Sequence, residues 1–217
     1  MLPTDEYYIQ KLIDEGEHVH QDFKFAISDA RKIAKSISAF SNTEGGRLLV
    51  GVKDNGKIAG VRSEEEIYMI EAAAKMYCTP EVNISNKIFR VQGKDVLEVC
   101  IEESKNKPVC AIDENNKLWA YVRINDENIL ADTVFLNRWK HNKQEEKVIV
   151  TYSEREKYLL DILSKNKELT LNQCSRLSRI PRITTSRLLA DFIRFDLVEQ
   201  IFREHTFYFR LKEENTK

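Results

Sequence analysis

Residues Ala39 to Gly60, which read AFSNTEGGRLLVGVKDNGKIAG, decide the fold of this chain. The polar residues before Gly45 and Gly46 predict the end of a helix and then a tight turn, because such a turn needs the positive φ that glycine adopts without strain. The apolar run from Arg47 to Lys53 predicts a buried strand. The turn residues Asp54-Asn55-Gly56 then predict a hairpin.

Before this stretch the sequence predicts a helix, a strand and a second helix. Asp5 to Glu15 carries apolar residues at helical spacing. Val19 to Phe25 alternates apolar and polar residues, which is the period of a strand with one face on a core. Ser28 or Asp29 is expected to cap the helix that leads into the central stretch.

After the stretch, strands and helices are mixed without regular alternation. Ser63 and Glu66 have the spacing of a capping box and predict a helix that reaches about Tyr77. A helical pattern is expected at Ile129 to Lys140, and paired strands are expected at 83–91 with 96–102 and at 108–112 with 118–124. This order predicts an α+β fold with a mixed sheet and flanking helices.

The C-terminal part has a different pattern. The sequence predicts a first domain at residues 1–141, a polar and charged linker at 142–151, and a second domain at 152–217. In the second domain, helices are expected at 153–163, 170–177 and 184–195, followed by a two-stranded hairpin around Arg203-Glu204-His205. This order of elements resembles a winged helix-turn-helix domain.

The composition limits the classes of protein to which the chain can belong. Of the 217 residues, 42% are hydrophobic and 32% are charged, as in soluble globular proteins. No apolar run approaches the ~18 residues of a membrane span, and the first residues lack a secretory signal, so we expect a cytoplasmic protein without a membrane partner. The scattered cysteines form no Cys-x-x-Cys pair, which argues against a zinc ribbon or a disulfide framework.

Charge is distributed unevenly between the two parts. Residues 151–217 contain 13 Lys and Arg against 10 Asp and Glu, whereas residues 1–150 contain 21 against 25. The second part is therefore the more compatible with a polyanion such as DNA.

The central stretch resembles the Schlafen-type AlbA-like domain, a module that has also been labelled "divergent AAA" or "ATP-binding". The resemblance includes Asp22-Phe23-Lys24, Lys107-Pro108 and Tyr121-Val122-Arg123, and it covers about Leu12 to Trp139. It implies an α+β domain with affinity for nucleic acids.

The resemblance also implies a set of acidic residues. Nuclease-active Schlafen relatives have a glutamate five residues before the acid of a Glu-Phe-Lys motif, and an aspartate after the Gly-Val strand. The matching residues are Glu17, Asp22 and Asp54, although Asp22 replaces the usual glutamate. Carboxylates bind Mg²⁺ or Mn²⁺, these ions activate water against a phosphodiester, and Lys24 would hold a phosphate. The alternative is a solvated, charged strand face with a turn aspartate.

Two further groups are candidate ligand sites. His18 and His20 fall on the predicted strand face of Asp22, where they would add ligands for a metal. A glycine-rich turn can present N–H groups to a phosphate, and the candidate ligands are Asn42, Thr43, Gly45 and Gly46. The alternative is a turn that sets strand packing. Because the sequence lacks Gly-x-x-x-x-Gly-Lys-Ser/Thr, no residue supports the ATP-binding label.

The third C-terminal helix is a candidate recognition helix. Such a helix places its N-terminal residues against base edges and its flanking residues on phosphates. The candidate DNA contacts are Arg179, Arg182, Thr184, Thr185, Ser186 and Arg187 at this helix, and Arg203 and His205 at the tip of the hairpin. The alternative is a module for protein interaction.

These patterns favour a DNA-binding, regulator-like protein. The alternatives are a metal-dependent nuclease that acts on RNA or single strands through Glu17, Asp22 and Asp54, and a nucleotide-sensing module. We expect a homodimer, because the chain has one lobe where eukaryotic Schlafen cores resemble two. Val134, Phe135 and Trp139 are the candidate interface. The alternative is a monomer in which Trp139 closes the junction between the domains.

Overall fold

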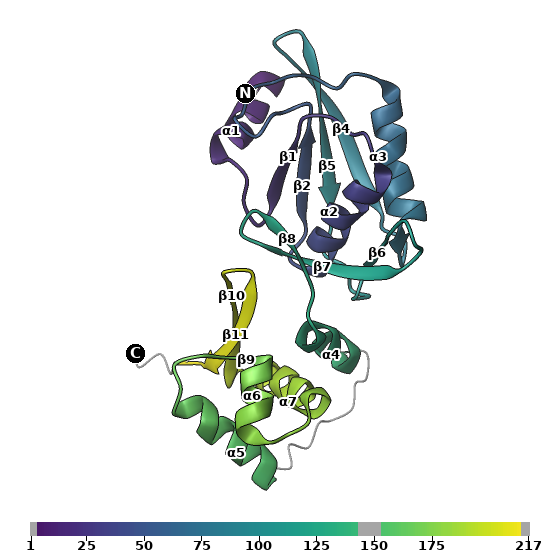
Figure 1. Cartoon of the computed structure of the whole chain (residues 1–217). Coiled ribbons are helices and arrows are strands. Elements are labelled where there is room, and N and C mark those ends of the chain that lie inside the picture. The colour runs from purple at the N-terminus through teal and green to yellow at the C-terminus, as the bar shows by residue number, and fades with distance from the viewer. Residues whose placement is uncertain (1–3, 143–152, 214–217) are drawn as a thin grey trace. The chain divides into compact units, whose positions relative to one another are not determined.

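A computed structural model describes residues 4–142 and 153–213 of the chain (Figure 1). The chain divides into two units, Met1–Leu130 and Ala131–Lys217. The division falls before the boundary expected at residue 141, because the helix that precedes that boundary packs with the second unit. Residues 143–151 of the expected linker lie outside the described residues.

The N-terminal unit has the expected α+β fold. Its helices are α1 (Asp5–Glu15), α2 (Ala30–Asn42) and α3 (Glu64–Met76). Its strands are β1 (Gln21–Lys24), β2 (Gly46–Val50), β3 (Cys78–Thr79), β4 (Ile84–Val91), β5 (Lys94–Ile101), β6 (Cys110–Ile112), β7 (Leu118–Ile124) and β8 (Glu127–Leu130).

These strands form two sheets. The first has the order β1-β2-β5-β4, with β1 parallel to β2 and the other neighbours antiparallel. The second has the order β3-β6-β7-β8 and is antiparallel. The mixed sheet that the sequence predicts is therefore present, with β1 at its edge.

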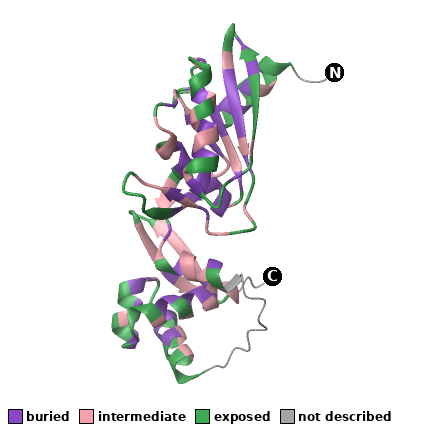
Figure 2. Cartoon of the chain, turned by 90° about the vertical axis from the view of Figure 1, so that its right-hand side faces the viewer, coloured by how far each residue is buried: buried purple, intermediate pink, exposed green. Residues whose placement is uncertain are grey.

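The mixed sheet is buried on both faces. Leu48 and Val50 of β2 pack against Ile37 of α2, whereas Leu49, between them, faces Leu12 of α1. This follows from the alternation of side chains along a strand. Figure 2 shows the buried residues running along the strands and the facing sides of the helices.

Two local expectations are wrong. Residues 18–20 form a tight turn, closed by hydrogen bonds between the backbones of His18 and Gln21, so the predicted strand begins only at Gln21. Ser63 precedes α3 but makes no side-chain capping bond. The Glu66 carboxylate instead accepts the backbone N–H groups of Ile27 and Arg62, at 2.8 Å each, and thereby ties the start of α3 to the chain before α2.

The C-terminal unit is mainly helical. Its helices are α4 (Thr133–Asn142), α5 (Glu154–Ser164), α6 (Leu171–Ser178) and α7 (Arg182–Arg194). Its strands are β9 (Leu169–Thr170), β10 (Val198–Arg203) and β11 (Thr206–Leu211), which form an antiparallel sheet in the order β10-β11-β9. The unit has its own core, which includes Leu159, Leu163, Leu189 and Phe209.

Helix α4 completes this core. Val134 is fully buried among the core residues, and the Phe135 ring lies 5.6 Å from Phe207 and 5.7 Å from Trp139. These are the side chains that were expected at a dimer interface. Because they pack within the chain, they are not an exposed surface for a second copy.

Candidate functional site

Glu17 and Asp22 are brought together at the edge of the mixed sheet. Glu17 lies in the turn before β1, and its Oε1 accepts the backbone N–H of Phe23 at 2.9 Å. Partial burial, and then a hydrogen bond to the Asp22 carboxyl, raise the pKa of Glu17. Two of the three expected acids therefore form a close pair.

Asp22 is neutralised by cations of the protein itself. Its side chain is buried, with only 3% of the residue exposed. The Lys24 ammonium lies 2.6 Å from Oδ2, and the Arg123 guanidinium lies 3.5 Å from Oδ1. The Lys24 ammonium also donates to the Phe23 carbonyl at 3.0 Å. Lys24 is thus engaged with the protein instead of being free for a phosphate.

Asp54 is not part of this pair. It is exposed in a turn that is closed by a hydrogen bond from Lys53 N to the Lys57 carbonyl at 3.0 Å. Asp54 follows the end of β2 at Val50, whereas Asp22 is buried within β1. Among the described residues, no three His, Cys, Asp or Glu side chains are placed to hold a metal ion.

The two histidines also lie apart from the expected strand face. The His18 and His20 rings meet edge to face at 6.1 Å, and His20 Nε2 lies 3.2 Å from the Glu44 carboxylate. Burial, and then the neighbouring His20, lower the pKa of His18. Because residues 18–20 form a turn, the two rings do not share the β1 face with Asp22.

Arg123 holds this corner of the domain together, although no role was predicted for it from the sequence. Its side chain is 1% exposed, and it donates to the Gln21 carbonyl and to Asn128 Oδ1 at 3.0 Å each. The guanidinium also lies over the Phe40 ring, 5.1 Å from its centre. An arginine within the apolar Tyr-Val-Arg strand was the available signal, since a buried charge needs a partner.

Asn42 and Thr43 hold elements together instead of facing a ligand. The Asn42 amide is buried; its Nδ2 donates to the Val109 carbonyl at 2.7 Å and to the Tyr121 carbonyl at 2.9 Å. The Thr43 hydroxyl accepts the backbone N–H of Arg123 at 2.8 Å. Both residues therefore fasten the end of α2 to the second sheet.

The glycines of the same turn allow close packing. The N–H groups of Thr43 and Gly45 both donate to the Phe40 carbonyl, at 3.1 and 3.0 Å. A Cβ atom at Gly46 would lie 2.5 Å from the Phe40 ring, and one at Gly45 would lie 2.8 Å from the Ile101 carbonyl. These contacts agree with the alternative interpretation of the glycine-rich turn, in which it sets strand packing and binds no phosphate.

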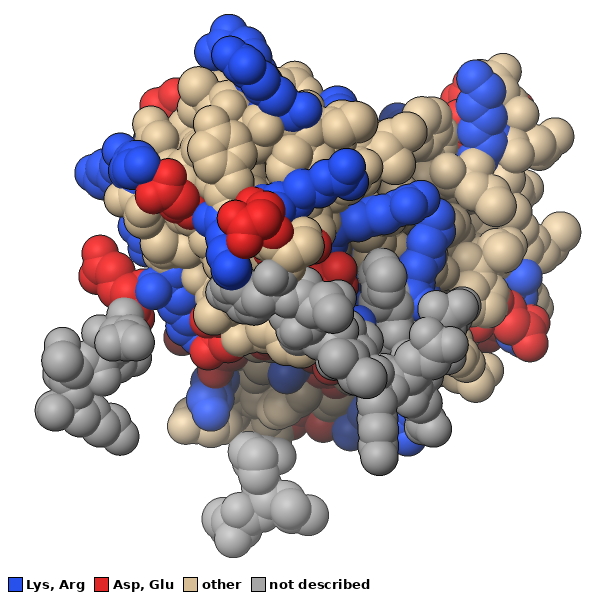
Figure 3. Space-filling model, turned by 90° about the horizontal axis from the view of Figure 1, so that it is seen from below, with Lys and Arg blue, Asp and Glu red and all other residues tan. Residues whose placement is uncertain are grey.

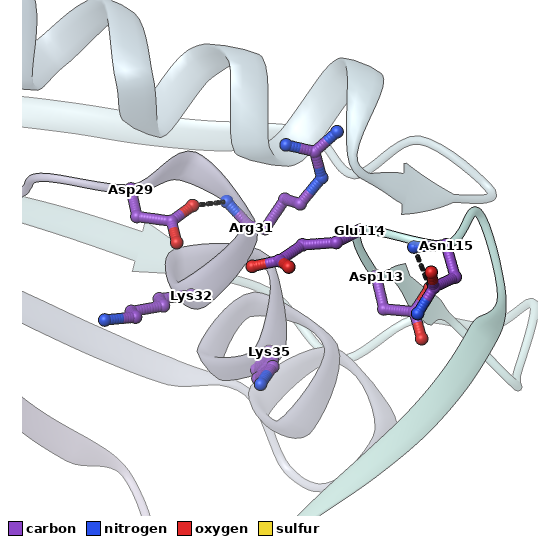
Figure 4. A pocket seen from close by; sticks show the side chains of 7 residues that line it. All are labelled: Asp29, Arg31, Lys32, Lys35, Asp113, Glu114 and Asn115. Atoms are coloured by element: carbon purple, nitrogen blue, oxygen red, sulfur yellow. Dashed lines mark hydrogen bonds between the residues drawn. The ribbon is translucent and has the colours of Figure 1, made fainter.

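A hollow of about 220 Å³ lies near the start of α2 (Figure 4). Arg31, Lys32 and Lys35 from α2 line it, together with the acids Asp29, Asp113 and Glu114 and the amide of Asn115. Acidic and basic side chains are equal in number here, so the hollow has no net charge with which to attract an anion.

The first turns of α7 in the C-terminal unit have one buried and one exposed side. The Thr185 hydroxyl is buried and donates to the Ile180 carbonyl at 3.2 Å. The Ser186 hydroxyl donates to the Ile183 carbonyl at 2.9 Å and accepts from Asn137 Nδ2 of α4 at 3.0 Å. These two expected DNA contacts therefore face the protein.

The exposed side carries arginines. Arg179, Arg182 and Arg187 are exposed, as expected, and Thr184 is half-buried. Arg176 of α6 is also exposed, although it was not among the predicted DNA contacts. In the part of the chain that the structure describes, none of the four arginines forms an ion pair.

Several other cations of this unit do form ion pairs. Arg203 at the hairpin tip pairs with Glu168, Arg210 pairs with Glu199, and Lys165 pairs with Asp161. His205 is exposed at the tip, where its ring lies 6.4 Å from the Phe202 ring. Figure 3 shows Lys and Arg side chains at several places on the face seen from below, with Asp and Glu beside some of them.

Comparison with known families identifies the N-terminal unit. The family model described as "Schlafen, AlbA_2" matches residues 17–132, more than half of the chain. The protein belongs to the Schlafen AlbA_2 family. The resemblance drawn from the central stretch is thereby confirmed.

Solved structures with similarity to this AlbA_2 protein are distant. The DIP2311 protein from Corynebacterium diphtheriae is 21% identical, with a TM-score of 0.42, over 57% of this chain and 24% of its own. The N-terminal domain of a RecG-related protein from Nitrosomonas europaea is 19% identical, with a TM-score of 0.44, over 58% and 92%. This chain thus spans about a quarter of the first. No curated protein matches it in sequence.

Within the AlbA_2 domain, Lys24 and Arg123 balance the charge of Asp22. The C-terminal unit, in contrast, presents four exposed arginines that form no ion pair with the residues that the structure describes. Among the residues that the structure describes, no helix is both long and apolar enough to cross a bilayer.

Proposed function

We propose that this AlbA_2 protein binds double-stranded DNA through its C-terminal unit and acts as a transcriptional-regulator-like protein. The observation that carries the proposal is a group of exposed arginines without ion pairs on α6, after it and on the first turns of α7, which we call the α7 cation group: Arg176, Arg179, Arg182 and Arg187.

The order of elements supports this assignment. Helices α5, α6 and α7 precede the β10–β11 hairpin, and β9 pairs with β11, an order of elements that resembles a winged helix-turn-helix domain. In such domains the third helix enters the major groove with its N-terminal end. The α7 cation group surrounds that end.

The electrostatics are consistent with a phosphate backbone. An exposed arginine that forms no ion pair adds positive potential to the surface, and it releases counterions from DNA when it contacts a phosphate. Within the group, Arg182 also donates from Nε to Asn172 Oδ1 at 3.0 Å. The N-terminus of α7 adds the positive end of the helix dipole. Arg203 is already paired with Glu168, so we expect the hairpin tip to contribute less than α7 does.

The observations favour binding over cleavage. A nuclease site that uses Mg²⁺ or Mn²⁺ needs its acids around the ion, whereas here only Glu17 and Asp22 meet, and Lys24 and Arg123 already balance Asp22. The alternative of a nucleotide sensor has no support at the Gly45-Gly46 turn, because the N–H groups of Thr43 and Gly45 are bonded within the protein.

The test is to replace Arg182 and Arg187 together by alanine in the full chain. Affinity for fluorescent duplex DNA should fall, and the slope of log K against log salt should decrease by about two, because each lost phosphate contact lowers it by about one. Both side chains are exposed, and the hydrogen bond that is lost, from Arg182 Nε to Asn172 Oδ1, is exposed as well, so the melting temperature should change little.

Arg155→Ala is the matched control, because Arg155 is an exposed arginine on α5 of the same unit. It should leave affinity and slope close to those of the unaltered protein. If the double variant binds duplex DNA with unchanged affinity and unchanged salt dependence, the proposal is wrong.

A further inference from the structure

Ile183 is the second residue of α7 and is 69% exposed, more than any other large apolar side chain in the described residues. The apolar residues later in α7, such as Leu189 and Phe192, are buried in the core of the unit. Ile183 is therefore the apolar residue of this helix that takes no part in the core.

Folding gives no reason for isoleucine at this position. Its side chain is mostly exposed and thus forgoes most of the stabilisation that burial would provide. A β-branched residue is also a weaker helix former than alanine or leucine. An exposed apolar residue that stands alone needs no explanation, but this one lies within a group of unpaired cations.

The cations around Ile183 select the kind of partner. Arg182 precedes it directly, and Arg187 lies one helical turn further on, on the same side as Ile183. A surface that is positive around an apolar centre is complementary to a polyanion that offers an apolar group between its charges. In the major groove of DNA, the apolar group at the base edges is the 5-methyl of thymine.

We infer that Ile183 is a specificity-determining residue that reads the 5-methyl group of a thymine in the major groove. This deepens the proposed function and rests on it. Arg182 and Arg187 hold the start of α7 against the phosphates, and Ile183 between them meets a base edge. The arginines supply affinity for any sequence, and Ile183 supplies a preference.

The experiment removes the methyl group from the DNA. Duplexes that bind the full chain are selected from a random library, and each thymine of the selected site is replaced in turn by deoxyuridine, which differs only by that methyl. At one position the unaltered protein should bind about fourfold more weakly, the factor that corresponds to one buried methyl group. The Ile183→Ala variant should show no loss at that position.

Two variants serve as controls. Ile183→Val keeps a branched apolar side chain and should retain most of the methyl effect. Leu197→Ala, which alters another exposed apolar residue of the unit, should retain all of it. Because Ile183 is exposed, its replacement should leave the melting temperature unchanged.

The outcomes separate this inference from the proposed function. If duplex DNA binds but no thymine methyl is coupled to Ile183, or no sequence is preferred, the inference is overturned while DNA binding stands, and Ile183 is then available to a protein partner. If duplex DNA does not bind at all, the proposed function and the inference both fail.

Discussion

At the scale of single residues, the environment of Glu17 decides its charge. The carboxyl is partly buried and shares a hydrogen bond with Asp22, so the folded protein holds the Glu17 proton more tightly than the unfolded chain does. For an acid with a raised folded-state pKa, the contribution to stability is present below the unfolded pKa and is lost as pH rises through the folded pKa. Glu17 therefore contributes less to the stability of the fold at neutral pH than at low pH.

Glu17→Gln should consequently raise the melting temperature at neutral pH. Glutamine keeps the Oε1 acceptor for the Phe23 N–H and removes the negative charge beside Asp22. The gain should shrink as pH falls below the folded-state pKa of Glu17, where the unaltered carboxyl is already protonated. Thermal unfolding across this pH range measures it, with Glu15→Gln on the exposed side of α1 as control. An equal gain at every pH would contradict the assignment.

At the scale of elements, the turn between α2 and β2 requires glycine because there is no room for a side chain. Gly46 has the Phe40 ring on one side and the His20 carbonyl, 2.7 Å from an added Cβ, on the other. Neither can withdraw easily, because Phe40 is in the core and the His20 carbonyl accepts the Arg47 N–H at 2.9 Å. The close contact between α2 and the sheet thus depends on the absence of a side chain at Gly46.

Gly46→Ala should therefore lower the free energy of unfolding by about 1–3 kcal/mol, the usual cost of overpacking. Urea denaturation measures this loss. Gly93 is the matched control: it sits in an open turn with nothing within 4 Å of an added Cβ, and asparagine tolerates its positive φ of 75°. Gly93→Asn should thus change stability little. Equal losses at both glycines would show that space at Gly46 is not the cause.

At the scale of the whole molecule, α4 belongs with the C-terminal unit. Val134 lies in that unit's core, and Asn137 bonds to Ser186 of α7. The backbone N–H groups of Val134 and Phe135 both donate to the Asp132 carboxylate, at 3.0 and 2.9 Å, which caps the start of the helix. A unit without α4 would expose the core that Val134 covers.

A fragment of residues 131–217 should for this reason unfold cooperatively, at a higher temperature than a fragment of residues 152–217. Burial of a valine side chain alone contributes about 1.5–3 kcal/mol. Circular dichroism during heating compares the two. If the shorter fragment is as stable as the longer one, α4 contributes nothing to this unit.

Signals that lie close together in the sequence predicted the elements well. Helix α1 has the expected bounds, and Asp29 caps α2 by accepting the Arg31 N–H at 2.8 Å. The buried face of α7 could also have been predicted, because Thr185 lies four residues before Leu189 and so falls on the core side of the helix. Patterns of this kind depend only on the period of one element.

The candidate site was harder to predict because it depends on distant pairings. The motif spacing grouped Asp54 with Asp22, but Asp54 lies in an exposed turn after β2, whereas Asp22 is buried in β1. The turn at residues 18–20 interrupts an alternation that continues in the sequence. Similarly, the partners of Arg123 lie mostly about a hundred residues before it, and no local pattern indicates them.

The amide of Asn42 also bears on how the chain is made. Its acceptors, the carbonyls of Val109 and Tyr121, follow it by 67 and 79 residues. Since a ribosome adds residues from the N-terminus onwards, α2 is synthesised long before the strands that bind its last residue exist. A nascent chain that ends before Tyr121 thus contains an α2 whose last residue lacks one of its carbonyl acceptors. The AlbA_2 domain can complete its packing only after β7 has been translated.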